Sequence, residues 1–301
     1  MSQIFDAIHR SESARRGGKF SGSVAARELL EAAERQLGQA ERGSTVQPEL
    51  TGEDFSQLPS TPVDTSPFTA LVCATDRECL AAEKFRYLGV RLRQLQQKRP
   101  INRLLITSTL PEEGKSTVAA NLAITLAARG LQKILLLEGD LRRPSLTGLF
   151  GLERCAGLSE WLQGETSATM NVCRLENLGF WLLPAGCPPE DPLTLLQSEK
   201  LSELLDPLQS WFDWIIIDSP PVLPLGDTSV WMRLCDATLL VTRPGKTEKR
   251  QLQRTLEAVE QTKLLGALVN GSTETGASNY YHYYAGKPQL PYPSKHPPTS
   301  S

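Results

Sequence analysis

Between residues 76 and 271, short runs of apolar residues alternate with longer segments that have helical spacing. The apolar runs are RLLITS, KILLLEGD, LGFWLLPAG, WIIID, ATLLVTR and LLGALVN, and helical patterns begin near Ser116, Leu158, Ser198, Asp227 and Glu248. Near-continuous apolar strands separated by helices are typical of a mainly parallel sheet that is covered on both faces. The sequence therefore predicts an α/β fold with a doubly wound sheet, whose ligands bind at the carboxyl ends of the strands.

Composition divides the chain of 301 residues into three zones. Residues 1–75 are rich in Ser, Gly, Thr, Pro and charged residues, and we predict that they are largely disordered. Residues 76–271 form the predicted domain. Residues 272–301 have too little aliphatic content for a core and are predicted to be a flexible tail. Five of the six tyrosines lie in this tail: Tyr280, Tyr281, Tyr283, Tyr284 and Tyr292.

The bulk properties exclude several classes of protein. A formal net charge of −2 argues against a general binder of nucleic acid or anionic membranes. The six cysteines are scattered without a Cys-x-x-Cys pair, which favours reduced, mostly buried thiols over a disulfide framework or a zinc site. The amino terminus lacks the apolar centre of a signal peptide, and no apolar run approaches the roughly 18 residues of a membrane span. We therefore expect a cytoplasmic protein that reaches the inner face of the plasma membrane only through a partner.

The segment STLPEEGKSTVAANLAITLAARG directly follows the first apolar run and matches the second half of a P-loop. In such a loop Gly114 lets the backbone approach phosphate, Lys115 reaches the β/γ oxygens, and the Ser116 hydroxyl binds Mg²⁺. Thr109 stands where a strict P-loop has Gly, and an ordinary strand–turn–helix junction is the alternative interpretation. The nucleotide-binding residues predicted in this segment are Thr109, Glu113, Gly114, Lys115, Ser116 and Thr117.

Two later strands end at acidic residues. WIIIDSPP places Asp218 after four apolar residues, which is typical of a Walker B carboxylate in the magnesium shell, although such an end also serves solubility. In ILLLEGDLRRP, Glu138 and Asp140 leave the strand on the same side and can face one metal-bound phosphate, unless this is a solvated turn with a surface salt bridge. We predict Arg142 as a nucleotide contact, the metal ligands Ser116, Asp140 and Asp218, and the catalytic residues Lys115, Glu138, Asp140 and Asp218.

Together with LLVTRPGKT and the tail tyrosines, these motifs resemble the bacterial tyrosine autokinases of exopolysaccharide and capsule synthesis over about residues 70–284. That family is related to the deviant P-loop partition ATPases. Their signature lysine would follow Thr109, and Leu110 stands there instead, which favours the kinase branch. The resemblance implies that the protein binds ATP and Mg²⁺ and transfers the γ-phosphoryl group to tail tyrosines of a neighbouring subunit. The alternative is an aromatic tail that binds a partner unmodified.

The resemblance has two departures. The family usually has Asp where this chain has Glu138, and the extra methylene would shift alignment by about an angstrom, enough to lower the rate up to ~10²-fold. In the helix predicted near residues 76–98, the family's self-association motif is Glu-x-x-Arg-x-x-Arg; Glu83 and Arg86 match, but Gly89 takes the last position. Arg93 lies on the same helix face as Arg86 and could substitute for it, or these charges form a solvated face. The predicted apolar face of this helix is Ala81, Phe85, Leu88, Leu92 and Leu95.

The leading functional prediction is a protein-tyrosine autokinase that controls polysaccharide chain length and export. Its expected partners are other copies in a ring-like oligomer, a separate membrane-embedded chain-length regulator and a phosphotyrosine phosphatase, with no nucleic acid. The alternative is a nucleotide-switched ATPase scaffold of the export machinery with little kinase activity.

Overall fold

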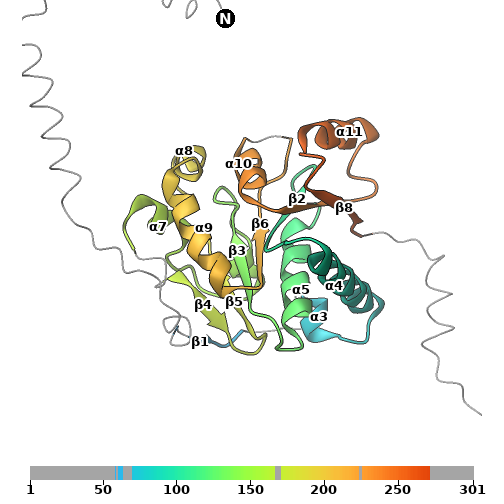
Figure 1. The fold of residues 1–301 in the computed structure, drawn as a ribbon, viewed down its shortest axis with the longest axis horizontal. Helices are drawn as coiled ribbons and strands as arrows, with labels where there is room; N and C mark the ends of the chain where they lie inside the picture. Colours follow the sequence, from blue (N-terminus) through green and yellow to red (C-terminus); the bar gives the residue numbers. More distant parts are fainter. Residues whose placement is uncertain (1–57, 59, 64–69, 167–170, 224–225, 272–301) are drawn as a thin grey trace, which may run out of the picture. The chain divides into compact units, whose positions relative to one another are not determined.

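A mostly parallel sheet forms the centre of the protein in the computed structural model, which describes residues 58, 60–63, 70–166, 171–223 and 226–271 (Figure 1). Within these residues the sheet has eight strands in the order β1-β4-β5-β3-β6-β2-β7-β8, and only β4 and β5 pair antiparallel. The strands are β1 (Ser60–Thr61), β2 (Arg103–Ser108), β3 (Ile134–Glu138), β4 (Cys173–Leu175), β5 (Phe180–Leu183), β6 (Trp214–Asp218), β7 (Ala237–Thr242) and β8 (Leu264–Val269).

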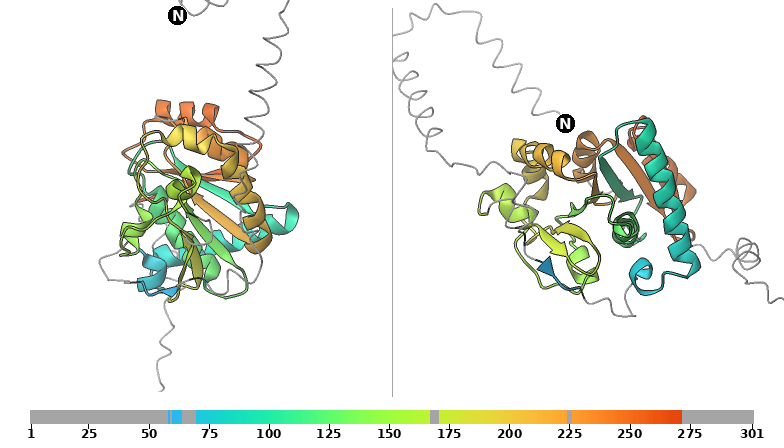
Figure 2. Two further views of the ribbon diagram at one scale, coloured as in Figure 1. Left: turned by 90° about the vertical axis from the view of Figure 1, so that its left-hand side faces the viewer. Right: turned by 60° about the horizontal axis from the view of Figure 1, so that its bottom comes forward.

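Helices cover both faces of this sheet, as the apolar runs predict (Figures 1 and 2). One apolar layer joins α3, α4, α5 and α6 to the sheet, and the other joins α7, α8, α9 and α10 to the opposite face. The helices are α3 (Val72–Thr75), α4 (Leu80–Lys98), α5 (Lys115–Ala127), α6 (Leu146–Leu149), α7 (Leu158–Gln163), α8 (Pro192–Leu196), α9 (Glu199–Trp211), α10 (Asp227–Leu234) and α11 (Lys249–Ala258). The doubly wound α/β fold is thus confirmed.

The register of the central strands brings the acidic motifs together. Strand β6 lies between β2 and β3, and Glu138 and Asp218 are paired positions at the ends of β3 and β6. The loop after β2 leads into α5, whose small side chains are buried nearly all round because the helix packs between α4 and the sheet. The P-loop segment and both acidic strand ends therefore meet at one edge of the sheet.

Three details differ from the sequence prediction. The folded unit includes residues before 76, because β1 pairs with β4 and Leu71 is fully buried. On α4 the inward face contains Ala82 rather than Ala81, which is exposed. The antiparallel strand β4 has only three residues and carries no apolar run that would reveal it.

The six cysteines are free thiols, but only Cys73 and Cys235 are buried. Among the described residues, no helix combines the length and apolar character that crossing a bilayer requires. Residues 1–57 and 272–301 lie outside the described part of the chain, and so do the five tail tyrosines.

Candidate active site

The loop between β2 and α5 has a backbone conformation that glycine permits. Gly114 has a φ of 90° and is the residue before the first turn of α5. A Cβ atom at this position would collide with the side-chain amide of Asn270, so that a larger residue would displace that side chain. The amide groups that begin α5 have no partners within the helix, and they are available to an anion.

Glu113 stabilises this loop through hydrogen bonds on the side that faces away from the cavity. Its side chain is fully buried, and its carboxylate accepts hydrogen bonds from the Leu110 amide, at 2.7 Å, and from the Thr247 hydroxyl. The Asn270 side chain donates to the Glu113 carbonyl at 2.9 Å. Glu113, predicted as a nucleotide contact, therefore holds the loop to the segments around β7 and β8 and does not line the cavity.

Glu112 has a positive φ of 61°, which is uncommon for a residue other than glycine. Its exposed carboxylate forms an ion pair with Lys246 at 2.7 Å. Hydrogen bonding to Lys246 is the main reason why the pKa of Glu112 lies below its usual value. This pair joins the P-loop to the segment after β7.

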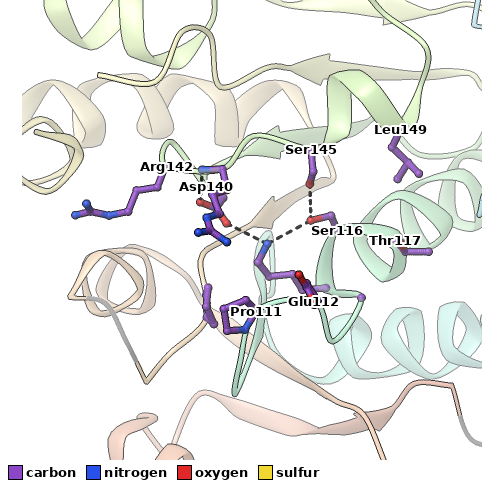
Figure 3. A pocket seen from close by; sticks show the side chains of 12 residues that line it. Pro111, Glu112, Ser116, Thr117, Asp140, Arg142, Ser145 and Leu149 are labelled. Carbon is purple, nitrogen blue, oxygen red and sulfur yellow. Dashed lines mark hydrogen bonds and ion pairs between the residues drawn. The ribbon is translucent and has the colours of Figure 1, made fainter. Parts of the chain in front are cut away.

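A cavity of about 540 Å³ opens beside the loop (Figure 3). Six of the predicted site residues line it: Gly114, Lys115, Ser116, Thr117, Asp140 and Arg142. The sequence prediction missed the others, which are Pro111, Glu112, Arg143, Ser145, Leu149 and Pro221. Figure 3 shows Asp140 and Ser145 pointing from the β3–α6 side toward the P-loop residues. The cavity thus lies between two segments that each carry a predicted motif.

Lys115 and Asp140 form an ion pair across this cavity. The Lys115 Nζ lies 3.0 Å from the Asp140 Oδ2, and both side chains are almost buried. Burial lowers the pKa of Lys115, but the carboxylates of Asp218 and Asp140 outweigh this effect and raise it above its usual value. Lys115 is consequently a permanent cation at the start of α5.

Asp218 is a fully buried carboxylate, and neither of its oxygens accepts a hydrogen bond of normal geometry within the described residues, although the Ser116 hydroxyl lies close by. Burial raises its pKa to about 6, although the positive charge of Lys115 and the nearby Ser116 hydroxyl oppose this shift. A buried, unpaired carboxylate is costly, and binding a cation removes that cost. Asp218 does not itself line the cavity, but the Ser116 hydroxyl and the Asp140 carboxylate do, and both lie close enough to Asp218 to affect its pKa. The donors of these three residues are all oxygen atoms, which fits Mg²⁺. The buried Thr109 hydroxyl also has no partner among the described residues.

Arg142 is held at the cavity by α10. Its guanidinium donates to both carboxylate oxygens of the buried Asp227, at 2.7 and 3.1 Å. This bidentate geometry uses two of the five guanidinium donors and leaves the remaining ones for other partners. Arg142 therefore has a fixed orientation at the edge of the cavity.

Comparison with known proteins shows which family has this arrangement, although no family model matches the chain. The tyrosine-protein kinase YwqD of Bacillus subtilis is 34% identical over 215 residues, which cover 71% of this chain and 90% of that protein. The tyrosine-protein kinase CpsD of Streptococcus pneumoniae serotype 4 is 35% identical over 168 residues, covering 55% and 74%. The chain belongs to the family of bacterial protein-tyrosine kinases. The solved kinase domain of the Escherichia coli tyrosine kinase ETK matches with a TM-score of 0.64 and 30% identity, covering 67% of this chain and 79% of that one.

The first departure from this kinase family, Glu138, does not face the cavity. Its carboxylate accepts hydrogen bonds from the backbone amides of Ser145, Leu146 and Ala185. Burial raises the pKa of Glu138, while these three amides oppose the shift. The expectation that Glu138 and Asp140 point at one phosphate is therefore wrong in geometry: Asp140 lines the cavity, and Glu138 contacts the backbone behind it.

The second departure, Gly89, has a packing reason. It is buried on α4, and a Cβ atom there would lie 3.2 Å from the Thr125 methyl carbon of α5. Arg93 does not replace the missing arginine, because its guanidinium donates to the Leu126 carbonyl and to the Gln132 side chain. Glu83 and Arg86 form an exposed ion pair with each other.

Proposed function

We propose that the protein is an ATP-dependent tyrosine autokinase that transfers the γ-phosphoryl group of ATP to tail tyrosines of a neighbouring copy. The acceptors proposed are Tyr280, Tyr281, Tyr283, Tyr284 and Tyr292, which lie outside the described residues. We propose transfer between subunits because a tail that belongs to one copy raises the effective concentration of its tyrosine hydroxyl groups at the site of a neighbouring copy.

The single observation that carries this proposal is the unpaired buried carboxylate of Asp218 beside Lys115 at the start of α5. Ser116, Asp140 and Asp218 would hold Mg²⁺, which when bound neutralises charge on the phosphate oxygens. The amides at the start of α5 would bind the β-phosphate, and Lys115 would contact the β/γ oxygens. Thr117 and Arg142 line the same cavity and would contact the nucleotide.

Phosphoryl transfer requires little covalent chemistry from the protein, because positioning and charge neutralisation supply most of the catalysis. In the proposed step a tyrosine hydroxyl oxygen forms a bond to the γ-phosphorus while the bond from that phosphorus to the β,γ-bridging oxygen breaks. ADP leaves, and the hydroxyl proton is released to water. Lys115 stabilises the charge that develops toward the leaving oxygen. Arg142, which Asp227 holds at the cavity edge, would contact phosphate oxygens with its remaining donors.

We infer further that the kinase acts in polysaccharide export, where it controls chain length. The support is the resemblance to the autokinases of exopolysaccharide and capsule synthesis. The proposed partners are other copies in a ring that uses Glu83 and Arg86, a membrane-embedded regulator that places the kinase at the inner face of the membrane, and a phosphotyrosine phosphatase. The exposed position of the Glu83–Arg86 pair suits a contact between copies.

A nucleotide-switched ATPase scaffold is the second candidate. The observation in its favour is Glu138, which stands where the family usually has Asp and whose oxygens are occupied by backbone amides. A scaffold would bind and hydrolyse ATP without labelling tyrosine.

A mixing experiment tests transfer between subunits. Lys115→Met has acceptors but a defective site, and a chain shortened to residues 1–271 has a site but no tail tyrosines. We expect neither protein alone to yield tail phosphotyrosine, and the mixture with Mg²⁺ and ATP to label the tail of Lys115→Met. An unlabelled mixture, with a parent chain that labels itself, would restrict transfer to one chain. A parent that hydrolyses ATP without any phosphotyrosine would favour the scaffold.

A further inference from the structure

Glu138 is a buried carboxylate that connects three segments behind the candidate active site. It ends β3 and has no exposed surface. One oxygen accepts the amides of Ser145 and Leu146 at the start of α6, and the other accepts the Ala185 amide at 3.1 Å. The segment around Ala185 in turn holds the start of α7, because the Ala185 carbonyl accepts the Ser159 amide at 2.9 Å.

The start of α6 carries the side chain that reaches the phosphate site. The Ser145 hydroxyl donates to the Ser116 hydroxyl at 2.9 Å, and this contact crosses the cavity between α6 and α5 (Figure 3). Glu138 itself does not line the cavity. Hydrogen bonds connect Glu138 to the site through one backbone segment and one hydroxyl group, and the charge of Glu138 also acts on Lys115 and Asp218.

The length of the Glu138 side chain allows its carboxylate to bind both of these backbone segments. A carboxylate must reach amides on two different segments at once, α6 on one side and the residues after β5 on the other. Aspartate at this strand position is shorter by one methylene, and its oxygens would leave part of these buried amides without an acceptor. An unsatisfied buried amide costs free energy, so α6 would move or loosen.

We propose that Glu138 is a positioning residue, which fixes the start of α6 so that the Ser145 hydroxyl meets Ser116 at the phosphate end of the cavity. It is neither a metal ligand nor a proton acceptor. The inference rests on the proposed function for its kinase readout, but its nucleotide-binding readout is independent of kinase activity.

Two conservative variants of Glu138 distinguish a positioning role from a role that depends on its negative charge, according to which of them weakens ADP binding more. Glu138→Asp keeps the charge and loses the reach. Glu138→Gln keeps the reach and loses the charge: its oxygen can still accept the Ser145 and Leu146 amides that begin α6, and the acceptor it loses is the one for the Ala185 amide. We expect Glu138→Asp to weaken Mg²⁺-dependent ADP binding about tenfold and Glu138→Gln to weaken it less, with autophosphorylation falling in the same order. The pH dependence of kcat in Glu138→Gln should match that of the parent protein. Retention of activity by Glu138→Asp with its loss in Glu138→Gln, or a changed pH profile, would overturn the proposal.

A double-mutant cycle tests whether Ser145 is the link. We expect Ser145→Ala to weaken ADP binding with Mg²⁺ by an amount similar to that of Glu138→Asp, and the double variant to lose no more than about twofold beyond either. Ser145→Ala keeps the backbone amide that Glu138 binds, so it tests the role of the Ser145 hydroxyl even if Glu138→Asp does not fold. ADP binding by Ser145→Ala equal to that of the parent protein would overturn the proposal. Additive losses in the double variant would also overturn it.

Glu160 offers a matched control. Its carboxylate also accepts two backbone amides, those of Gly157 and Cys187, but these residues do not line the cavity. We expect Glu160→Asp to lower the melting temperature without changing ADP affinity by more than about twofold. Weakened binding in this control would show that any loosening of the loops has the same effect, which contradicts a specific path through Ser145. If the parent binds ADP with the expected dependence on Ser145 and yet never labels tyrosine, the proposed function fails and the positioning role stands.

Discussion

The unpaired carboxylate of Asp218 predicts that the protein without nucleotide and metal is destabilised at neutral pH. Burial raises the pKa of Asp218 to about 6, above the 3.8 of an exposed aspartate. The folded state therefore binds a proton more tightly than the unfolded state. The stability that protonated Asp218 contributes to the folded state is complete below about pH 4 and is lost as the pH rises through about 6. A difference of about two pKa units corresponds to about 3 kcal/mol in the free energy of unfolding.

Asp218→Asn removes this loss while nearly preserving the shape of the side chain. In buffer with a chelator and no nucleotide, we expect the stability advantage of the variant over the parent to increase by about 1–2 kcal/mol between about pH 5 and about pH 8. Urea denaturation at several pH values measures it. With Mg²⁺ and ADP at pH 8 the order should reverse, because only the parent gains from binding. A constant difference for Asp218→Asn would refute the reasoning.

Three further predictions concern the P-loop and the packing around it. Lys115→Met should abolish autophosphorylation and the melting shift caused by Mg²⁺ and ATP while leaving the circular dichroism spectrum unchanged; equal shifts in both proteins would contradict the assignment. Gly139→Ala should lower the free energy of unfolding by about 1–3 kcal/mol in urea denaturation, because its Cβ would lie 2.8 Å from the Trp231 ring, and unchanged stability would show that the ring moves aside. Gly89→Arg should destabilise by a similar amount, whereas Gly89→Ala should be nearly neutral because the helix propensity of alanine offsets a 3.2 Å contact with Thr125; equal effects would contradict the close packing of α4 on α5.

Much of the fold could be predicted from the sequence, because the buried parallel strands are continuous apolar runs. The strand predicted at WIIID is β6, and the helices predicted near Leu158 and Asp227 begin at those residues. The short antiparallel strand β4 could not be predicted, since three residues with mixed polarity give no periodic signal. Gly89 also could not be interpreted from the sequence alone. A glycine within a helix predicts a less stable helix, and only the contact with Thr125 shows that this glycine allows α4 to pack closely on α5.

Sequence spacing also located the cavity but not every residue that shapes it. Lys115, Ser116 and Asp140 line the cavity as the motifs predict. Ser145 was missed because its approach to Ser116 depends on the hydrogen bonds of Glu138, which no local pattern reveals. Asn270 lies 157 residues from the loop that it holds, a contact that depends on the order of strands in the sheet. Spacing along one strand placed Glu138 on the side of Asp140, but it could not show that backbone amides already occupy that carboxylate.

The central claim, that the protein is an autokinase whose acceptors are in the tail, is tested most directly by mass spectrometry of residues 272–301 after incubation with Mg²⁺ and ATP. The predicted result is phosphate on one or more of the tail tyrosines in the parent protein and none in Lys115→Met. An unmodified tail in a parent protein that binds and hydrolyses ATP would contradict the claim.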